Sequence, residues 1–291
     1  MTDRRIDLHA HSTASDGTTP PAEVMARAAA AGLDVIALTD HDTQAGLPEA
    51  LASLPRGLTL VPGAEISCAV GGSDSGGTSL HLLGYLFDPA EPTLARELEL
   101  LRTDRTRRGE AMVRRVRELG ADVSWERVRE LAARGSVGRP HVARALVEAG
   151  VVPSVKAAFS PEWIGSGGRA YVNKYALDPH RAISLVRAAG GVPVFAHPGA
   201  ASRGPVVDDD EIASMAAAGL GGLEVDHPDH DPATRLRLRR LADELGLFVT
   251  GSSDDHGEIT GYRLGVESTA EQAYEALLAQ ATGATPLRSS S

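Results

Sequence analysis

Short apolar runs alternate with amphipathic segments over most of the chain. Residues 34–39 (Asp-Val-Ile-Ala-Leu-Thr) are almost uniformly apolar, as expected for a parallel strand that is buried on both faces. Residues 20–31 begin with two prolines and are followed by Gly32, which predicts a helix with proline in its first turn. The same reasoning predicts strands at 5–10, 58–61, 63–67, 79–87, 170–172, 192–196, 222–226 and 247–251, and helices at 44–53, 179–189, 208–218, 232–245 and 270–281. This alternation indicates an α/β fold built on a largely parallel sheet.

The alternation stops after residue 89. Residues 93–119 predict a long charged helix with apolar residues at helical spacing, and shorter helices are expected at 125–134 and 140–149. An all-helical block of about 75 residues within an α/β pattern is best interpreted as an inserted subdomain. We therefore expect a discontinuous barrel domain at 1–90 and 170–285, a helical cap at 91–169, a hairpin or flexible loop at 71–77, and a disordered polar tail at 286–291.

Composition and charge narrow the class of protein. The chain has 291 residues, a formal net charge of −10 and no Lys/Arg-rich run, which argues against tight nonspecific binding to long nucleic acid. A small anionic substrate stays compatible with this balance, because bound metal ions supply positive charge. Cys68 is the only cysteine, which excludes a disulfide framework and a Cys-rich zinc site and favours a small buried thiol.

The chain carries no pattern typical of export or of membrane insertion. No apolar run approaches transmembrane length, and five mostly polar residues lead directly into the first predicted strand, leaving no room for a signal peptide. We expect a cytoplasmic enzyme that does not bind membranes. No long apolar face is left over to indicate an oligomeric state.

Candidate chemistry begins at the end of the first predicted strand. His9 and His11 are two residues apart and therefore point to the same face of a strand, which is half of a typical metal site. The turn-rich residues that follow bring Asp16 back over the strand's end. Taken alone, such a pair is more simply explained as partly exposed histidines beside a solvated aspartate. However, Asp40-His41 repeats the arrangement after the next strand.

Further histidines and carboxylates follow the other predicted strands. Since the carboxyl ends of the strands in a parallel α/β barrel share one face, these residues should meet there. A mixed set of imidazoles and carboxylates suits Mn²⁺, Fe²⁺ or Zn²⁺, and the lack of thiolate gives no special preference for zinc. The residues concerned are Glu65, His197, Asp226, His227, Asp229, His230, Asp254, Asp255 and His256.

The order of these motifs resembles that of the PHP (polymerase and histidinol phosphatase) family. His9-x-His11, Ser15-Asp16-Gly17, Thr39-Asp40-His41-Asp42, Ala196-His197-Pro198 and Ser253-Asp254-x-His256 carry the resemblance, which spans nearly the whole chain. It implies a metal-dependent phosphoesterase with a distorted (β/α)7 barrel. The helical insertion and Gly138-Arg139-Pro140-His141 resemble the branch of 3′,5′-nucleoside bisphosphate phosphatases and RNase AM-type enzymes, which carries an inserted cap.

The resemblance implies a site for three divalent ions, with Mn²⁺ expected before Fe²⁺ or Zn²⁺. The first ion would be held by His9, His11, Glu65 and Asp254, the second by Glu65, His81 and His197, and the third by Asp16, His41 and His256. No distinctive motif surrounds His81, so a core or surface strand histidine is the alternative there. Asp255 departs from related sequences, which often carry an aromatic residue, and it would add negative charge near the site.

The same resemblance implies a substrate and a reaction. The expected reaction is hydrolysis of the 3′-phosphate of a nucleoside 3′,5′-bisphosphate such as pAp by a metal-bridging hydroxide, with short 5′-phosphorylated RNA as a further substrate. Arg139 and Lys174, with His227, would contact phosphate, and His227 would also act in catalysis. A helix that starts with proline after Arg139 offers free N–H groups to an anion. The alternative for both cations is a solvated surface charge.

Asp40 has three possible roles. It could orient His41 from behind, assist proton transfer as a catalytic residue, or cap the helix expected at 44–53.

Three other functions compete with the bisphosphate phosphatase. They are a histidinol-phosphate or other small phosphomonoester phosphatase, a catalytically inert metal-binding module, and a proofreading exonuclease domain that acts on DNA. The helical cap argues against the small monoester phosphatase, and the full set of ligand types argues against the inert module. The acidic net charge argues against the exonuclease domain.

Overall fold

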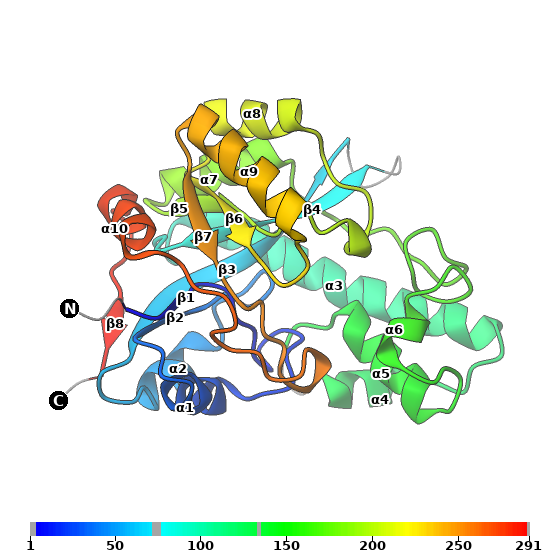
Figure 1. The fold of residues 1–291 in the computed structure, drawn as a ribbon. Coiled ribbons are helices and arrows are strands. Elements are labelled where there is room, and N and C mark those ends of the chain that lie inside the picture. Colours follow the sequence, from blue (N-terminus) through cyan, green and yellow to red (C-terminus); the bar gives the residue numbers. More distant parts are fainter. Residues whose placement is uncertain (1–3, 72–76, 133–134, 290–291) are drawn as a thin grey trace.

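The computed structural model describes residues 4–71, 77–132 and 135–289. Seven strands lie side by side in chain order, from β1 to β7. The first three and the last three strands pair in parallel, whereas β4 runs antiparallel to both of its neighbours. A parallel bridge between Ala10 and Asp255, which follow β1 and β7, brings the two edges of the sheet together. The result is the expected barrel, nearly closed and distorted at β4 (Figure 1). The strands are β1 (Ile6–Asp7), β2 (Val35–Leu38), β3 (Thr59–Val70), β4 (Thr78–Tyr85), β5 (Val192–Phe195), β6 (Gly222–Asp226) and β7 (Phe248–Gly251).

The reversed direction of β4 follows from its short connection to β3. Parallel neighbours need a crossover of a dozen or more residues, whereas Gly71 and Gly77 bound a much shorter link. The antiparallel pairing of β3 with β4 fits the expected hairpin, whose central residues 72–76 lie outside the described ranges. The pairing also puts His81 opposite Ser67, inside the strand rather than at a carboxyl end.

Within the described ranges, six helices cover the outside of the barrel. Their buried faces form the core with the strands, as Val24, Met25 and Ala28 do on α1. In α9, Asp231 accepts a hydrogen bond from the Thr234 N–H at 2.7 Å and the left-handed Gly246 ends the helix, so that the expected bounds are confirmed. The helices are α1 (Pro21–Ala30), α2 (Leu47–Ala52), α7 (Pro179–Ala188), α8 (Asp209–Ala217), α9 (Pro232–Leu245) and α10 (Glu271–Gln280).

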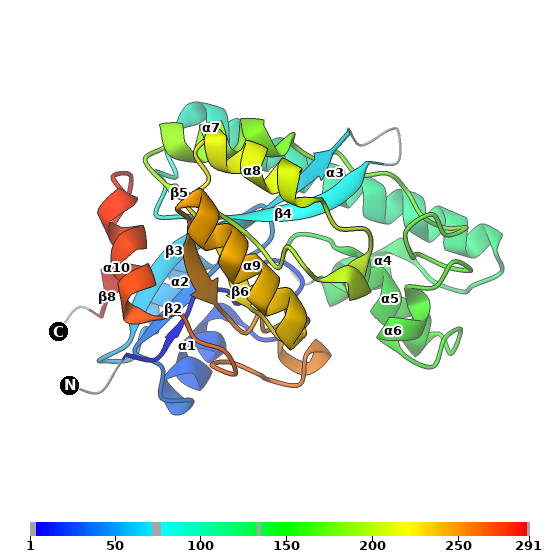
Figure 2. The same ribbon diagram turned by 45° about the horizontal axis from the view of Figure 1, so that its top comes forward.

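The long helix α3 (Pro92–Glu118) joins the barrel to the inserted helices α4 (Trp125–Leu131), α5 (Arg139–Glu148) and α6 (Val155–Ala158). Leu94 and Leu101 in its first half belong to a barrel core cluster, whereas Met112 and Val116 belong to a separate cluster in the insertion. Figures 1 and 2 show the insertion on the side of the barrel away from both termini. We propose that residues 91–169 act as a cap that shares α3 with the barrel.

Three local features differ from the expectations. Residues 170–172 form no strand, because the Val172 carbonyl accepts from Arg108 Nε at 2.7 Å instead of entering a sheet ladder, and the Tyr171 carbonyl accepts from Arg115. The four-residue helix α6 was not predicted. The expected tail is wrong at Leu287–Arg288, which form β8 and pair antiparallel with β3. No helix in the described part of the chain is long and apolar enough to cross a membrane.

Candidate metal centre

His9 and His11 leave the end of β1 with their rings facing each other. Their Nε2 atoms lie 3.1 Å apart, and both residues are fully buried. Two ring nitrogens at this distance either share one proton or bind one cation between them. A metal–nitrogen bond of about 2.0–2.1 Å places neighbouring donors of one shell about 3 Å apart, so the pair has the separation of two ligands of a common ion.

Two carboxylates complete the first donor group. Glu65 Oε2 lies 3.3 Å from His9 Nε2 and 3.1 Å from His11 Nε2. Asp254 Oδ1 lies 3.3 Å and 3.2 Å from the same two nitrogens. Among the described residues, buried Asp254 Oδ1 has no hydrogen-bond partner, which fits an atom that binds a metal ion. The four expected ligands of the first ion are therefore gathered around one point.

Glu65 connects this group to the second one. Its other oxygen, Oε1, lies 2.8 Å from His81 Nδ1 and 3.0 Å from His197 Nε2. The Nδ1 atom of His41 lies 3.1 Å from Glu65 Oε2. Despite these short distances, the buried Nδ1 atoms of His41 and His81 form no hydrogen bond within the described part of the chain. The geometry therefore gathers His81 with the other candidates and adds His41 to this group.

Asp16 organises the third group. Its oxygens lie 3.4 Å from His256 Nε2, 3.6 Å from His41 Nε2 and 3.8 Å from His11 Nδ1. His11 and His41 thus direct one ring nitrogen into this group and the other into a neighbouring group. Eight of the nine residues expected as ligands lie in three adjoining groups that are able to bind metal ions. His197 belongs to none of these groups, although its Nε2 lies 3.0 Å from Glu65 Oε1.

Electrostatics favour cations at this centre. Burial opposes the ionised forms of Glu65 and Asp254, but the surrounding imidazoles, joined at Asp254 by Arg203, hold the pKa of both carboxyls well below its usual range. Burial lowers the pKa of His197 to about 4, which keeps its ring neutral and able to coordinate a metal. Burial would also lower the pKa of His11, but hydrogen bonds with Asp254 and Glu65 raise it to about 10. The carboxylates thus attract protons and would attract divalent ions in their place.

Glu224 holds two of the histidines and was missed by the sequence analysis. It is fully buried in β6, accepts from His9 Nδ1 at 2.9 Å and accepts from the His197 backbone N–H at 2.8 Å. The first bond leaves the lone pair of neutral His9 on Nε2, the atom that faces the carboxylates. The second holds His197 in a strained left-handed conformation with φ of 35°. A carboxylate inside the apolar run of β6 was the available signal.

Asp40 is hydrogen-bonded to two serines of the loop that follows His11. Its oxygens accept from Ser12 N at 2.8 Å, Ser12 Oγ at 2.7 Å and Ser15 Oγ at 2.6 Å. The helix α2 begins after Gly46 with no side-chain cap, so the capping role is wrong. The hydrogen bonds join Asp40 to the loop between His11 and Asp16, not to His41. We propose that Asp40 positions that loop, and its expected part in proton transfer stays a prediction.

Asp255 serves its own loop. It is buried, accepts from Gly257 N at 3.0 Å and from Arg263 N at 2.7 Å, and accepts from Thr260 Oγ1 at 3.0 Å. These donors hold its charge in the turn that carries His256, so Asp255 is a structural acceptor of that turn.

His227 and an unpredicted arginine approach Asp254 from the far side. His227 Nδ1 accepts from the Asp229 backbone N–H at 3.0 Å, so a neutral ring carries its proton on Nε2, 3.4 Å from Asp254 Oδ2. Arg203 Nη2 donates to the same oxygen at 2.6 Å, and its Nε donates to Asp229 Oδ2 at 2.7 Å. Asp254 therefore presents Oδ1 to the histidines of the metal centre and Oδ2 to hydrogen-bond donors.

Arg139 lies near Asp16 and Lys174 lies near His81, and the two cations are close enough to affect each other. Arg139 starts α5, and its guanidinium carbon lies 5.1 Å from the Phe159 ring centre. Burial lowers the pKa of Arg139, although Tyr171 and Asp16 oppose this shift. Burial lowers the pKa of Lys174 to about 7, helped by nearby arginines, and Lys174 in turn lowers the pKa of His81. Both are half-buried, and with Arg105 and Arg108 they form a cation cluster.

Comparison with known proteins identifies the family. A family model described as the PHP domain matches residues 7–120. The chain is 34% identical over 260 residues to a 3′,5′-nucleoside bisphosphate phosphatase of Chromobacterium violaceum, and the match covers 89% of each protein. The chain belongs to the PHP family. It is a metal-dependent phosphoric ester hydrolase, as the resemblance of its motifs implied.

Two further relatives support this assignment. A 5′-3′ exoribonuclease of Haemophilus influenzae is 34% identical over 254 residues, covering 87% of this chain and 90% of that protein. A crystal structure from Bifidobacterium adolescentis, of a protein assigned as a metal-dependent phosphoesterase, superposes with a TM-score of 0.88 at 33% identity and covers 96% of this chain and 97% of that one. The barrel and its inserted helices are therefore shared with a solved structure over nearly their whole length.

Proposed function

We propose that this enzyme removes the 3′-phosphate of nucleoside 3′,5′-bisphosphates such as pAp. The observation that carries the proposal is the distribution of positive groups. The metal centre provides one place for a phosphoryl group, and Arg139 provides a second, separate cation near its Asp16 end. A monophosphate such as histidinol phosphate needs only the first. The bisphosphate phosphatase of Chromobacterium violaceum supports the same choice.

The metal centre is proposed to hold three divalent ions, with Mn²⁺ preferred and Fe²⁺ or Zn²⁺ as alternatives. Three buried atoms that have no hydrogen-bond partner among the described residues fit such ions: His41 Nδ1, His81 Nδ1 and Asp254 Oδ1. When bound, the ions lower the pKa of water and neutralise charge on the phosphoryl oxygens. We assign the ligands as the sequence resemblance implied; His41, whose Nδ1 lies near Glu65 and whose Nε2 lies near Asp16, would help to hold the third ion.

The side chains around the centre bind the substrate and transfer protons. Arg139 binds the 5′-phosphate, and Lys174, at the His81 end, binds an outward oxygen of the scissile phosphate. As water attacks phosphorus and the bond from phosphorus to the 3′-oxygen breaks, His227 donates its Nε2 proton to the departing ribose oxygen. The attacking water later returns a proton to the ring. Arg203, hydrogen-bonded to Asp254, fixes the carboxylate that faces His227.

Phosphate release from pAp, 3′-AMP and histidinol phosphate tests this proposal. We expect kcat/KM to be about tenfold to a hundredfold higher for pAp than for 3′-AMP, because one charge-assisted contact contributes about 1.5–3 kcal/mol. Arg139→Ala should remove this preference and leave activity on 3′-AMP nearly unchanged. Lys174→Ala should lower activity on both nucleotides.

Each competing reading has its own outcome. Equal activity on pAp and 3′-AMP in the wild type would refute a 5′-phosphate site. A preference for histidinol phosphate would favour the monoester phosphatase. Absence of turnover in a protein that binds metal would favour the inert module.

A further inference from the structure

The barrel sheet has a seam between its first and last strands. The strand order runs from β1 to β7, and no ladder joins these two strands within the described ranges. Beyond the strands, one bridge pairs Ala10 with Asp255, and His11 N donates to Asp255 O at 2.9 Å. The seam divides the first group of donors, because His9 and His11 follow β1 whereas Asp254 follows β7. The two edges must therefore stay in register for these residues to hold one ion.

Asp7 crosses the seam with its side chain. It is fully buried in β1, and its Oδ1 accepts from the Ser253 backbone N–H at 3.0 Å and from the His9 backbone N–H at 3.3 Å. Its Oδ2 accepts from the Gly265 backbone N–H at 2.8 Å. Ser253 and Gly265 bound the segment that carries Asp254. One carboxylate on β1 thus holds both ends of a segment that follows β7.

A carboxylate at this place in the core needs a physical reason. Ile6 and Leu8, on either side of Asp7, are fully buried in an apolar core cluster. A buried carboxylate is costly unless its oxygens are hydrogen-bonded, and buried backbone N–H groups need acceptors. The three N–H groups that donate to Asp7 lie outside the described strands. Asp7 therefore supplies the acceptors that a ladder would otherwise provide at the seam, which an apolar residue could not do.

The residue that follows Ser253 has a strained backbone. Asp254 has a φ of 49°, a left-handed conformation that residues with a side chain rarely adopt. Such a conformation persists when the surrounding contacts hold the chain in place. Asp7 accepts from the N–H immediately before Asp254, and His11 N donates to the carbonyl of Asp255 immediately after it. Both contacts come from β1 and the segment that follows it.

We propose that Asp7 is a positioning residue for the first metal ion, because it holds Asp254 across the seam from the two histidines that follow β1. This inference rests on the ligands proposed for that ion. Asp7 is not itself a ligand, and it acts through the backbone of the two segments that carry the ligands. Without its bonds, the segment after β7 would hold Asp254 in the binding geometry only part of the time. The apparent affinity for the ion would fall in proportion to that fraction.

Asp7→Asn tests this role by changing one atom. Asparagine keeps one oxygen and has an NH₂ group in place of the other, so it cannot accept from both Ser253 N and Gly265 N. Calorimetric titration of Mn²⁺ into the metal-free variant should show that the Kd of one ion per chain rises about 10- to 100-fold, as is typical when an outer partner of a metal site is lost. A Kd equal to that of the wild type for every bound ion would overturn the proposal.

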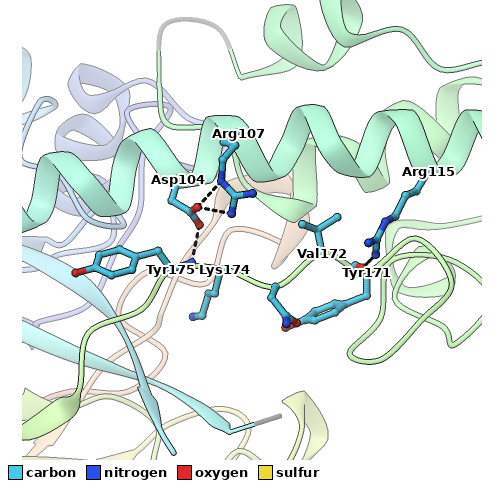
Figure 3. Close-up of a pocket in the computed structure, with 8 residues that line it drawn as sticks. Asp104, Arg107, Arg115, Tyr171, Val172, Lys174 and Tyr175 are labelled. Atoms are coloured by element: carbon cyan, nitrogen blue, oxygen red, sulfur yellow. Dashed lines mark hydrogen bonds and ion pairs between the residues drawn. The ribbon is translucent and has the colours of Figure 1, made fainter. Parts of the chain in front are cut away.

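Two control variants separate positioning from general stability. Ser268→Ala also removes a side chain that joins β1 to a segment after β7, since its Oγ accepts from Ile6 N at 3.0 Å, but this contact lies before Asp7. Arg115→Ala removes a hydrogen bond to the carbonyl of Tyr171 on the cap side, at the pocket shown in Figure 3. Neither change should alter the Kd of Mn²⁺. A rise in Ser268→Ala equal to that in Asp7→Asn would overturn the specific role of Asp7.

Amide hydrogen exchange of the metal-free proteins separates this inference from the proposed function. At least one of the Ser253 and Gly265 N–H groups should exchange faster in Asp7→Asn than in the wild type, because it loses its acceptor. The Thr269 N–H, which donates to Ile6 O at 2.9 Å, should exchange at the same rate in both proteins. This pattern supports the inference even if pAp is not hydrolysed. Equal exchange of the Ser253 and Gly265 N–H groups in the two proteins would overturn the inference even if pAp is a good substrate.

Discussion

Replacing Glu224 by Gln changes one atom and tests how the metal centre is held. Both oxygens of Glu224 accept a hydrogen bond, one from His9 Nδ1 and one from the His197 N–H. A glutamine has only one oxygen, so its amide group must face one of the two donors. If the glutamine NH₂ faces His9, Nδ1 of the His9 ring accepts its hydrogen bond. The neutral ring must then carry its own proton on Nε2, the atom that faces Glu65 and Asp254.

We therefore expect weaker metal binding rather than unfolding. Loss of such an orienting partner typically reduces metal affinity about 10- to 100-fold, which corresponds to about 1.4–2.8 kcal/mol. Calorimetric titration of Mn²⁺ into the metal-free variant measures this change. Asp226→Asn is the matched control, because Asp226 lies on the same strand but pairs with Arg239 on the outside. Wild-type affinity in Glu224→Gln would refute the orienting role.

Three shorter predictions follow from other buried groups. Asp40→Ala should lower the free energy of unfolding by about 1–3 kcal/mol in urea titrations, because Ser12 N loses its buried acceptor. Asp40→Asn should recover part of this loss, and equal stability of the wild type and both variants would contradict the positioning role. Because Lys174 loses its proton as pH rises through about 7, kcat/KM of the wild type on pAp should fall above that pH. In Lys174→Arg, kcat/KM should stay constant over the same pH range, and identical profiles of the two proteins would argue against a phosphate contact. Cys68→Ser should retain most activity, because burial raises the pKa of the thiol and keeps it from acting as a nucleophile, and a large loss with normal metal content would show otherwise.

The strands and outer helices could be predicted because their signals are local. The apolar run of residues 34–39 and the Asp231 cap of α9 carry their own periodicity and end signals. Residues 170–172 carry the same apolar signal, but arginines of α3 donate hydrogen bonds to their carbonyl groups. Those arginines lie more than 50 positions away in sequence, so the local pattern could not indicate them. The pairing of Leu287–Arg288 with β3 is likewise set by a distant strand.

The donor groups were predictable for a related reason. His9, His11, Asp16 and His41 follow strand ends, where the barrel topology collects them. His81 lies within the antiparallel β4, and no rule about strand ends could place it. Glu224 and Asp40 act through hydrogen bonds whose partners are set by tertiary packing. The family resemblance supplied His81, whereas the partners of the two carboxylates required the three-dimensional structure.

Phosphate release from pAp by the metal-stripped and the Mn²⁺-reconstituted protein tests the central claim most directly. The account predicts no release from the stripped chain, restored turnover with about three ions bound per chain by elemental analysis, and no restoration in His9→Ala or Asp254→Ala. Release of phosphate by the stripped protein at the reconstituted rate, or by the two variants at the wild-type rate, would contradict it.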